Sequence, residues 1–319
     1  MSYKPRLLDR VREAIRVRHY SYRTEQQYIA WIRRYILFHG RRHPRELAGA
    51  EVESFLTSLA TDRHVAAATQ AQALAAVLFL YKHVLNVDLP WLGNVIRARR
   101  PKRLPLVLTR SEVRRVLDNM DGQHRVIASL LYGSGLRVLE ALRLRVKDIN
   151  LERWILLVRN GKGGKDRVTV LPDSLRESLR AQIAWVRERH ADARKHGFAG
   201  VELPYALERK YPAAHLELGW QYVFPASRPS RDPRTGAWRR HHLRLESIQR
   251  AVKRAVRAAG IEKPASCHTF RHCFATHMIE TGADIRTVQE LMGHSSVKTT
   301  QIYTHVLNRG GIAARSPLD

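Results

Sequence analysis

The side chains able to do chemistry lie in five short strings that are far apart in the sequence and end in one tyrosine. In chain order they are Gly135-Leu136-Arg137, Gly161-Lys162-Gly163, His268-x-x-Arg271, Gly293-His294 and Tyr303. Guanidinium groups donate paired hydrogen bonds to phosphate oxygens, lysine and histidine can donate protons, and a phenol can act as a nucleophile. Together these groups could hold a phosphodiester and attack it without a metal ion.

Such an attack needs a nucleophile, an acid for the departing alkoxide and fixed positive charge for the oxygens that gain charge in the transition state. Tyr303 is the predicted nucleophile. Its phenol, with a reference pKa of about 10, needs a nearby base or a cationic field before it can attack. Arg137 and Arg271 suit the two non-bridging oxygens, because a planar guanidinium offers two parallel donors.

The remaining groups supply protons. Lys162, on a glycine-rich turn, suits proton donation to the departing 5′ oxygen. His268 lies three residues before Arg271, on the same face of a helix, and His294 follows a helix end, so either could donate to the phosphate or relay a proton. Because a covalent intermediate preserves the energy of the phosphodiester bond, we expect neither a nucleotide cofactor nor a metal.

Each of these residues also has a plainer explanation. Arg137 has the spacing of a surface ion pair with Glu140, and Lys162 could be a solvated loop lysine, with Lys165 as a competitor for its catalytic role. Tyr303 alone could be an ordinary half-buried tyrosine. No common structural need, however, places all of these groups in this order.

A zinc site is the alternative for the histidine string. His268 and His272 are one helical turn apart, which is a known ligand spacing, and further soft or imidazole ligands lie close by in the sequence. The candidate ligands are His268, His272, His277, Cys267 and Cys273.

The composition predicts a polyanionic partner. The chain has 319 residues, 44% of them hydrophobic, a mean hydropathy of −0.37, a formal net charge of +27 and a pI of about 11.0. A basic surface gains binding by releasing counterions from a phosphate backbone, so nucleic acid is favoured over an acidic membrane surface. The longest apolar stretch, Val65–Leu85, is interrupted by polar residues and is a poor membrane span. Two cysteines suggest a reducing, cytoplasmic setting, and we expect no membrane partner.

A basic, proline-containing linker predicts two domains. Residues 1–95 have helical periodicity, with helices near 24–36, 49–60 and 66–86, and Thr24-x-x-Gln27 and Thr69-x-x-Gln72 resemble capping boxes. The linker, residues 96–108, contains no acidic residue. Its predicted DNA contacts are Arg99, Arg100, Lys102 and Arg103.

Residues 109–319 form the predicted second domain. Helices are expected near 109–119, 123–133, 138–144, 174–195, 246–259, 268–281 and 284–293, with a last helix carrying Tyr303. Strands near 154–159 and 167–171 flank the glycine-rich turn and predict a hairpin, and residues 197–244 are expected to be irregular. The fold class is therefore mainly α with a small antiparallel β-sheet.

Five strings resemble the motifs of the tyrosine recombinases, or phage integrases. They are Tyr-Gly-Ser-Gly-Leu-Arg-Val-Leu-Glu (132–140), Gly-Lys-Gly-Gly-Lys-Asp-Arg (161–167), Cys-His-Thr-Phe-Arg-His-Cys-Phe-Ala-Thr-His (267–277), Leu-Met-Gly-His-Ser-Ser (291–296) and Thr-Thr-Gln-Ile-Tyr-Thr-His (299–305). The resemblance spans most of 107–308 and is specific.

The resemblance implies a fold and a reaction. Residues 1–95 would be a helical, SAM-like core-binding domain, and residues 109–319 an α+β catalytic domain that completes a C-shaped clamp on DNA. Arg137, Lys162, His268, Arg271 and His294 would bind the phosphate, and Tyr303 would form a 3′-phosphotyrosyl intermediate on the way to a Holliday junction. The family acts as a synaptic homotetramer, with a C-terminal exchange tail that corresponds here to residues 309–319.

The segment at about 198–242 resembles the insertion of integron integrases. The resemblance rests on Leu203–Pro212, Trp220–Pro225 and the stretch from Asp232-Pro233 to His242. That subfamily recombines gene cassettes at folded single-stranded sites, reading extrahelical bases, and also acts on a duplex integron site. Aromatic and imidazole faces suit stacking on unpaired bases, beside arginines that hold the backbone. The implied reading residues are Trp220, Pro233, Arg239, Arg240, His241 and His242.

Three other functions remain open at this point. One is a Xer-like or phage-type recombinase that acts on plain duplex sites. Another is a DNA-binding regulator that kept the fold and lost catalysis, although the complete set of catalytic residues argues against it. The third is a metal-dependent nuclease.

Overall fold

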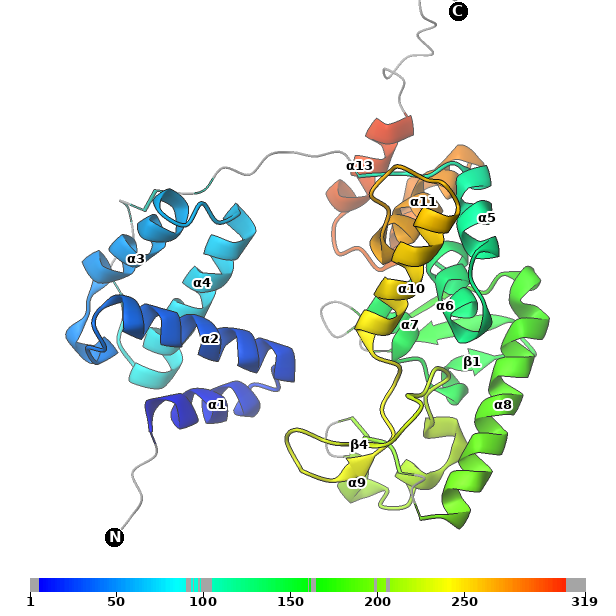
Figure 1. Cartoon of the computed structure of the whole chain (residues 1–319), viewed down its shortest axis with the longest axis horizontal. Coiled ribbons are helices and arrows are strands. Elements are labelled where there is room, and N and C mark those ends of the chain that lie inside the picture. Colours follow the sequence, from blue (N-terminus) through cyan, green and yellow to red (C-terminus); the bar gives the residue numbers. More distant parts are fainter. Residues whose placement is uncertain are drawn as a thin grey trace, which may run out of the picture. The chain divides into compact units, whose positions relative to one another are not determined.

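The computed structural model describes residues 6–89, 93, 95–96, 98, 105–159, 161, 165–197, 200–204 and 207–307. The chain divides into two compact units, Met1–Arg103 and Leu104–Asp319 (Figure 1). None of the helices in the described ranges is both long and apolar enough to cross a membrane.

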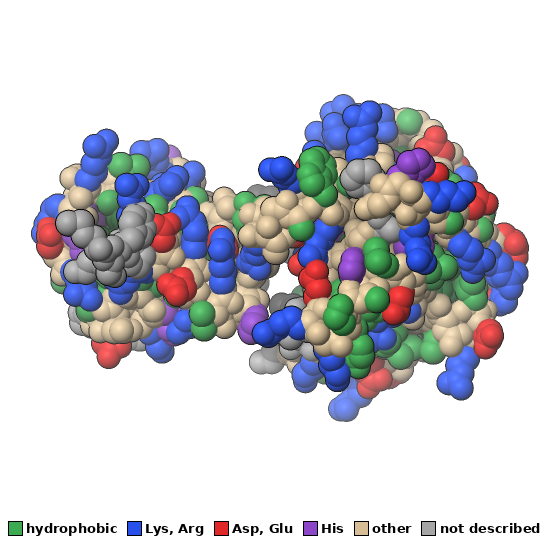
Figure 2. Space-filling model, turned by 90° about the horizontal axis from the view of Figure 1, so that it is seen from below, with side chains coloured by type: hydrophobic (Ala, Val, Ile, Leu, Met, Phe, Trp, Pro, Cys, Tyr) green, Lys and Arg blue, Asp and Glu red, His purple; other side chains and the backbone are tan. Residues whose placement is uncertain are grey.

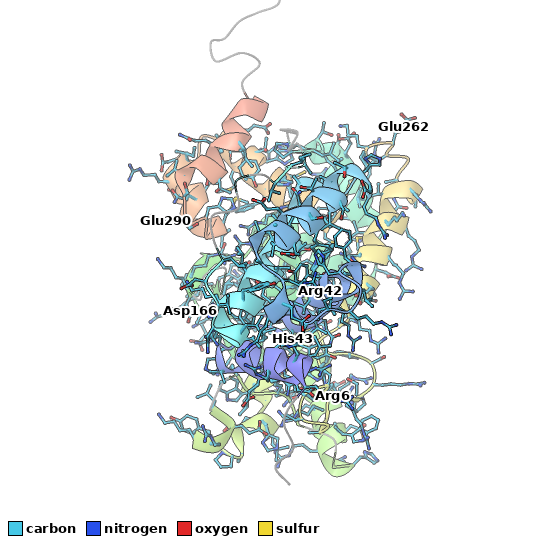
Figure 3. All side chains as sticks on the ribbon, turned by 90° about the vertical axis from the view of Figure 1, so that its left-hand side faces the viewer. Arg6, Arg42, His43, Asp166, Glu262 and Glu290 are labelled. Carbon is cyan, nitrogen blue, oxygen red and sulfur yellow. The ribbon has the colours of Figure 1, made fainter. Side chains whose placement is uncertain are left out.

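The first unit is a bundle of α-helices around one apolar core. The helices are α1 (Leu7–Val17), α2 (Tyr22–Phe38), α3 (Gly49–Thr61) and α4 (Ala67–Leu80), which continues as a π-helical turn, Tyr81–Leu85. Two aromatic residues of α2, Trp31 and Tyr35, lie in the core, and the Tyr35 hydroxyl is 2.8 Å from that of Tyr81. Arg42 and His43, labelled in Figure 3, are exposed in the turn after α2.

Both predicted capping boxes in this unit are wrong. Helix α2 begins one turn earlier than expected, because the Ser21 hydroxyl accepts a hydrogen bond from the Thr24 amide at 3.1 Å. Thr69 lies inside α4, whose N-cap is Ala66 with no side-chain hydrogen bond. This helix therefore starts where its alanine-rich face begins to pack on α2 and α3, without a local polar signal. Helix α1 was not predicted.

The second unit has a helical core built around α11. Its helices are α5 (Arg110–Asp118), α6 (Gly122–Gly133), α7 (Val138–Leu142), α8 (Arg176–Lys195), α9 (Leu207–Lys210), α10 (Leu245–Ala258), α11 (Cys267–Glu280), α12 (Ile285–Met292) and α13 (Val297–Leu307). Helix α11 packs against α6, α12 and α13, so it is buried on several sides. Asp284 caps α12, since its carboxylate accepts hydrogen bonds from the Arg286 and Thr287 amides.

The predicted hairpin is part of a three-stranded antiparallel sheet in the order β1 (Ile149–Asn150), β2 (Ile155–Val158), β3 (Arg167–Val170). In the hairpin Ile155 pairs with Val170 and Val158 with Arg167. The short strand β1 was not predicted, because two residues carry no readable alternation. Lys162 lies outside the described residues, whereas Lys165 is described and exposed.

The insertion lies at the end of the second unit opposite α13 (Figure 1), and its residues Val223 and Phe224 belong to the apolar core of that unit. Most of its described residues are irregular, as expected. A small hairpin, β4 (Ser230–Arg231) and β5 (Trp238–Arg239), adds regular structure that was not predicted. Asp232 closes its turn by accepting hydrogen bonds from the amides of Arg234 and Thr235.

Candidate active site

Arg271 lies at the centre of the site, on α11, and only 1% of its side chain is exposed. Its guanidinium donates to the carbonyl oxygens of Gly135 and Met292, which precede α7 and end α12. A buried charge is tolerated only where it is paired and hydrogen-bonded. The buried carbonyls therefore fix this guanidinium between two segments that are remote in the sequence.

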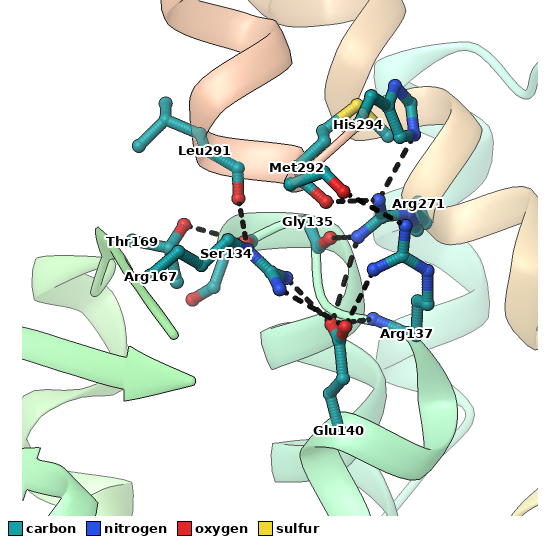
Figure 4. A network of polar contacts seen from close by, with 11 residues as sticks. Ser134, Gly135, Arg137, Glu140, Arg167, Thr169, Arg271, Leu291, Met292 and His294 are labelled. Atoms are coloured by element: carbon teal, nitrogen blue, oxygen red, sulfur yellow. Dashed lines mark hydrogen bonds and ion pairs between the residues drawn. The ribbon is translucent and has the colours of Figure 1, made fainter. Parts of the chain in front are cut away.

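Glu140 joins three arginines into one group, which we call the arginine cluster and define as Arg137, Arg167 and Arg271 around Glu140 (Figure 4). The Glu140 carboxylate accepts from Arg137 Nη1 at 2.7 Å and from Arg167 Nη2 at 2.7 Å, and lies 3.9 Å from Arg271 Nη1. Burial alone would raise the Glu140 pKa, but the hydrogen bonds and charge of Arg167, followed by those from Arg137, hold it at about 2.

The arginine cluster keeps excess positive charge. Three guanidinium groups and one carboxylate leave a formal charge of +2, and burial together with the neighbouring Arg137 lowers the Arg271 pKa to about 9. A site that holds this much charge away from water favours an anion, and forked guanidinium donors match the oxygens of a phosphodiester.

Two glycines, Gly135 and Gly293, allow the backbone to pack closely against the Phe274 and Arg167 side chains. Gly135 has φ +62°, and a Cβ there would lie 2.4 Å from the Phe274 ring. Gly293 has φ +61°, and a Cβ there would lie 2.9 Å from Arg167 Cδ. Both backbones are left-handed, where side chains are disfavoured. The glycines beside Arg137 and His294 are therefore needed for the packing of the cluster.

His294 and Tyr303 approach Arg271 from the C-terminal helices. His294 Nε2 is 3.2 Å from Arg271 Nη2, and its Nδ1 is 3.0 Å from the Thr300 hydroxyl. The rings of His294 and Tyr303 are nearly parallel, with centroids 6.3 Å apart. Tyr303 is 2% exposed. Burial raises its pKa, while Arg271 and Arg137 act in the opposite direction.

The two histidines that flank Arg271 form a chain to the tyrosine. His272 Nδ1 is 2.9 Å from the Tyr303 hydroxyl, and the ring centroids of His268 and His272 are 4.4 Å apart. Burial, His268 and Arg271 lower the His272 pKa to about 4. The His268 side chain is exposed to solvent, and partial desolvation followed by the charges of Arg271 and Arg137 lowers its pKa.

The structure thus places four of the other five predicted catalytic residues around Arg271, namely Arg137, His268, His294 and Tyr303. It adds Glu140 and Arg167, which the sequence did not single out as functional, and it places His272, which the sequence offered only as a zinc ligand, against the Tyr303 hydroxyl. All three lie inside the motif strings, but their charge alone did not reveal which groups they would contact. Within the described ranges, no group of three or more His, Cys, Asp or Glu side chains could hold a metal ion.

Several predicted reading residues of the insertion are engaged within the protein. The Lys147 ammonium lies 2.8 Å from the centre of the Trp220 ring, and Arg145 lies over the same ring. Arg239 forms an ion pair with Glu208 at 2.6 Å. Arg240 Nη1 donates to the carbonyl oxygens of Ala226 and Ser227. These arginines therefore stabilise the insertion itself.

The other predicted reading residues differ in exposure. His242 packs edge-on against Tyr222, and His241 Nε2 lies 3.9 Å from the Asp232 carboxylate. Pro233 is exposed in the β4–β5 turn, and Trp238 on β5 is 58% exposed. Trp238 was not predicted as a reading residue. An exposed indole on a hairpin is a flat face that a base could reach.

Basic side chains cover both units. Figure 2 shows Lys and Arg side chains on the visible surface of each unit, with fewer Asp and Glu side chains among them. The predicted linker contacts Arg99, Arg100, Lys102 and Arg103 lie outside the described residues, as does the predicted tail, 309–319.

Comparisons with known proteins match both units. The phage integrase family matches residues 107–309, and the N-terminal SAM-like domain of phage integrases matches residues 7–91. An integrase/recombinase of Escherichia coli is 53% identical over 314 residues, covering 98% of this chain and 93% of the relative. Tyrosine recombinase XerA of Pyrococcus furiosus is 36% identical over 209 residues, 65% of this chain and 59% of XerA. The crystal structure of XerH recombinase bound to palindromic difH substrate has a similar fold, with a TM-score of 0.61 and 20% identity over 94% of this chain and 81% of that one.

Proposed function

Since the chain belongs to the phage integrase family and is a tyrosine recombinase, we propose that it is an integron integrase. It cleaves and rejoins DNA and thereby captures and excises gene cassettes at folded single-stranded sites. Its partners are these sites, a duplex integron site and further copies of the chain in a synaptic tetramer that passes through a Holliday junction.

The arginine cluster carries the chemical part of the proposal. Arg137 and Arg271 hold the non-bridging oxygens, and His268 and His294 donate to the same phosphate. The Tyr303 oxygen attacks phosphorus, the bond to the 5′ oxygen breaks, and Lys162 protonates the leaving oxygen. Rejoining reverses these steps, so the bond energy is kept in the phosphotyrosyl ester and no nucleotide cofactor is needed.

The insertion carries the choice of DNA. It lies at the end of the unit opposite α13, so its residues select the substrate without taking part in the cut. Pro233 and Trp238 are exposed on the β4–β5 hairpin, where flat faces meet solvent. Stacking on such faces is worth about 1–3 kcal/mol per base. These exposed faces favour recognition of extrahelical bases by the insertion over recognition of an uninterrupted duplex.

A matched pair of substrates tests the proposal. Wild-type protein is incubated in chelator with a labelled folded single strand carrying extrahelical bases and with a labelled nicked duplex, and protein-linked DNA is measured for each. We expect adducts with both substrates. The triple substitution Trp220→Ala, His241→Ala, His242→Ala should abolish recombination of the folded site while the nicked duplex is still cleaved.

The packing of Trp220 under Lys147 calls for a second variant. Pro233→Ala combined with Trp238→Ala removes exposed faces and leaves that packing intact, so it should also weaken the folded site selectively. If both activities fall together in both variants, the insertion is a structural part of its unit. If neither falls, the chain is a Xer-like or phage-type recombinase of duplex sites. If neither substrate forms an adduct with the wild-type protein, a DNA-binding regulator without catalysis is favoured.

A further inference from the structure

The hydroxyl of Tyr303 is held by a histidine outside the set that the proposed mechanism uses. His272 Nδ1 lies 2.9 Å from that oxygen, on the residue directly after Arg271. The tyrosine is 2% exposed, so little water reaches its ring. A phenol that attacks phosphorus must release its proton, and here the neighbouring nitrogen is placed to receive it.

We propose that His272 is the general base of strand cleavage, accepting the Tyr303 proton at Nδ1 as the phenol oxygen bonds to phosphorus. This inference rests on the proposed nucleophilic role of Tyr303. The bond from Tyr303 Oη to phosphorus forms, the bond from phosphorus to the 5′ oxygen breaks, and the phenol proton moves to His272. On rejoining, the imidazolium returns the proton to the departing tyrosine oxygen.

The surroundings keep the His272 ring neutral and able to accept. Burial, together with the neighbouring His268 and Arg271 on α11, lowers its pKa to about 4. Tyr303 faces the ring from α13, and the His294 ring is nearly parallel to the phenol, with centroids 6.3 Å apart. Helix α6 presents Tyr132 to His277, at another position on α11. At neutral pH the Tyr303 hydroxyl is therefore the donor and His272 the acceptor.

The two histidines on this face of α11 have different positions. His272 contacts the reacting oxygen, whereas His268 contacts the His272 ring and is exposed to solvent. His268 can therefore bind the phosphate while His272 handles the proton. A general base contributes typically 10²–10⁴-fold to a rate.

Asparagine separates hydrogen bonding from proton acceptance. In His272→Asn the amide Oδ1 takes the place of Nδ1 and can still accept from the Tyr303 hydroxyl, but an amide does not take the proton. Single-turnover cleavage of a nicked duplex, measured from pH 6 to pH 9, should be slower by roughly 100-fold or more at pH 7. The rate of the variant should rise with pH as free phenolate accumulates, while the wild-type rate is flat from pH 7 to pH 9.

A more acidic nucleophile provides a second readout. Fluorinated tyrosine at position 303 lowers the phenol pKa, so the rise in the His272→Asn profile should move to lower pH and part of the rate should return. A purely structural role would give the same profile shape in both proteins and no recovery. His196→Asn, the same change at an exposed histidine at the end of α8, should match wild type. Gel-shift titration should give equal DNA binding for all three proteins.

The outcomes separate this inference from the proposed function. If wild-type protein forms no adduct, or Tyr303→Phe still forms one, the nucleophile is wrong. If wild type forms the adduct, Tyr303→Phe does not, and His272→Asn retains the wild-type rate and profile, then His272 is not the base. A slow His272→Asn protein whose profile is parallel to wild type would also overturn the inference, because it would assign His272 to positioning alone.

Discussion

Arg137 Nη1 donates a hydrogen bond to Glu140 Oε1 at 2.7 Å, three residues along the chain. In the sequence, an ion pair with Glu140 is the alternative to a phosphate-binding role for Arg137. In the structure, Arg137 can have both roles. Glu140 also binds Arg167 and lies near Arg271, so its carboxylate orients several guanidinium groups and the cluster still keeps positive charge. The ion pair positions Arg137 instead of removing it from the site.

Glu140→Gln should destabilise the protein in a pH-dependent way. The Glu140 pKa falls from 4.5 to about 2 on folding, so the carboxylate contributes roughly 3 kcal/mol that is fully present above pH 4.5 and lost as the pH falls towards 2. Urea unfolding is followed by tryptophan fluorescence. The free energy of unfolding of the variant should be lower than that of wild type by this amount at pH 7 and by a smaller amount at pH 3.

Glu177→Gln is the matched control for that experiment. Glu177 pairs with Arg180 at the same spacing, but its side chain is 82% exposed. Exposed pairs contribute about 0–1 kcal/mol, so this variant should unfold nearly as wild type does. If both variants lose the same free energy of unfolding, the buried network around Glu140 stabilises the protein no more than an exposed ion pair does.

Tyr303→Phe should abolish the covalent adduct and leave DNA binding intact. The ring keeps its place beside His294, and only the hydroxyl that is hydrogen-bonded to His272 is removed. Denaturing gels of labelled DNA measure the adduct, and gel shifts measure binding. Wild-type activity should persist in EDTA. Loss in EDTA that zinc restores would instead favour the histidine and cysteine metal site.

Lys162→Ala should cleave normal DNA poorly and recover on DNA whose 5′ leaving oxygen is replaced by sulfur. A thiolate leaves without a proton, so it bypasses a missing general acid. Cleavage rates with both substrates are compared for Lys162→Ala and Lys165→Ala. Recovery with Lys165→Ala, and none with Lys162→Ala, would exchange the two assignments.

Deleting residues 309–319 should weaken tetramer synapsis more than binding to a single site. The tail contains a glycine pair, Gly310-Gly311, and is too short to fold alone, and the family resemblance implies that it docks on a neighbouring copy. Gel-shift titrations with one and with two sites measure the two affinities. Equal losses would place the tail within its own domain.

The sequence alone was enough to identify the family, the hairpin, most helices of the second unit and the candidate catalytic residues. Periodicity predicts a helix because it depends on side chains three and four residues apart, and the motif strings are specific because each demands rare residue types at fixed spacings. Helix starts were less predictable. Ser21 caps α2 through one hydroxyl, and α4 begins at Ala67 with no polar cap at all.

Only the tertiary structure decided what each charged group touches. Arg167 and Glu140 are 27 residues apart, and His272 and Tyr303 are 31 apart, so no local pattern can pair them. The same holds for Trp220, which the sequence offers as an open aromatic face and which the fold places under Lys147. Long-range contacts of this kind arise when helices and loops pack into one core, and that packing determines burial, pKa and hydrogen-bond partner together.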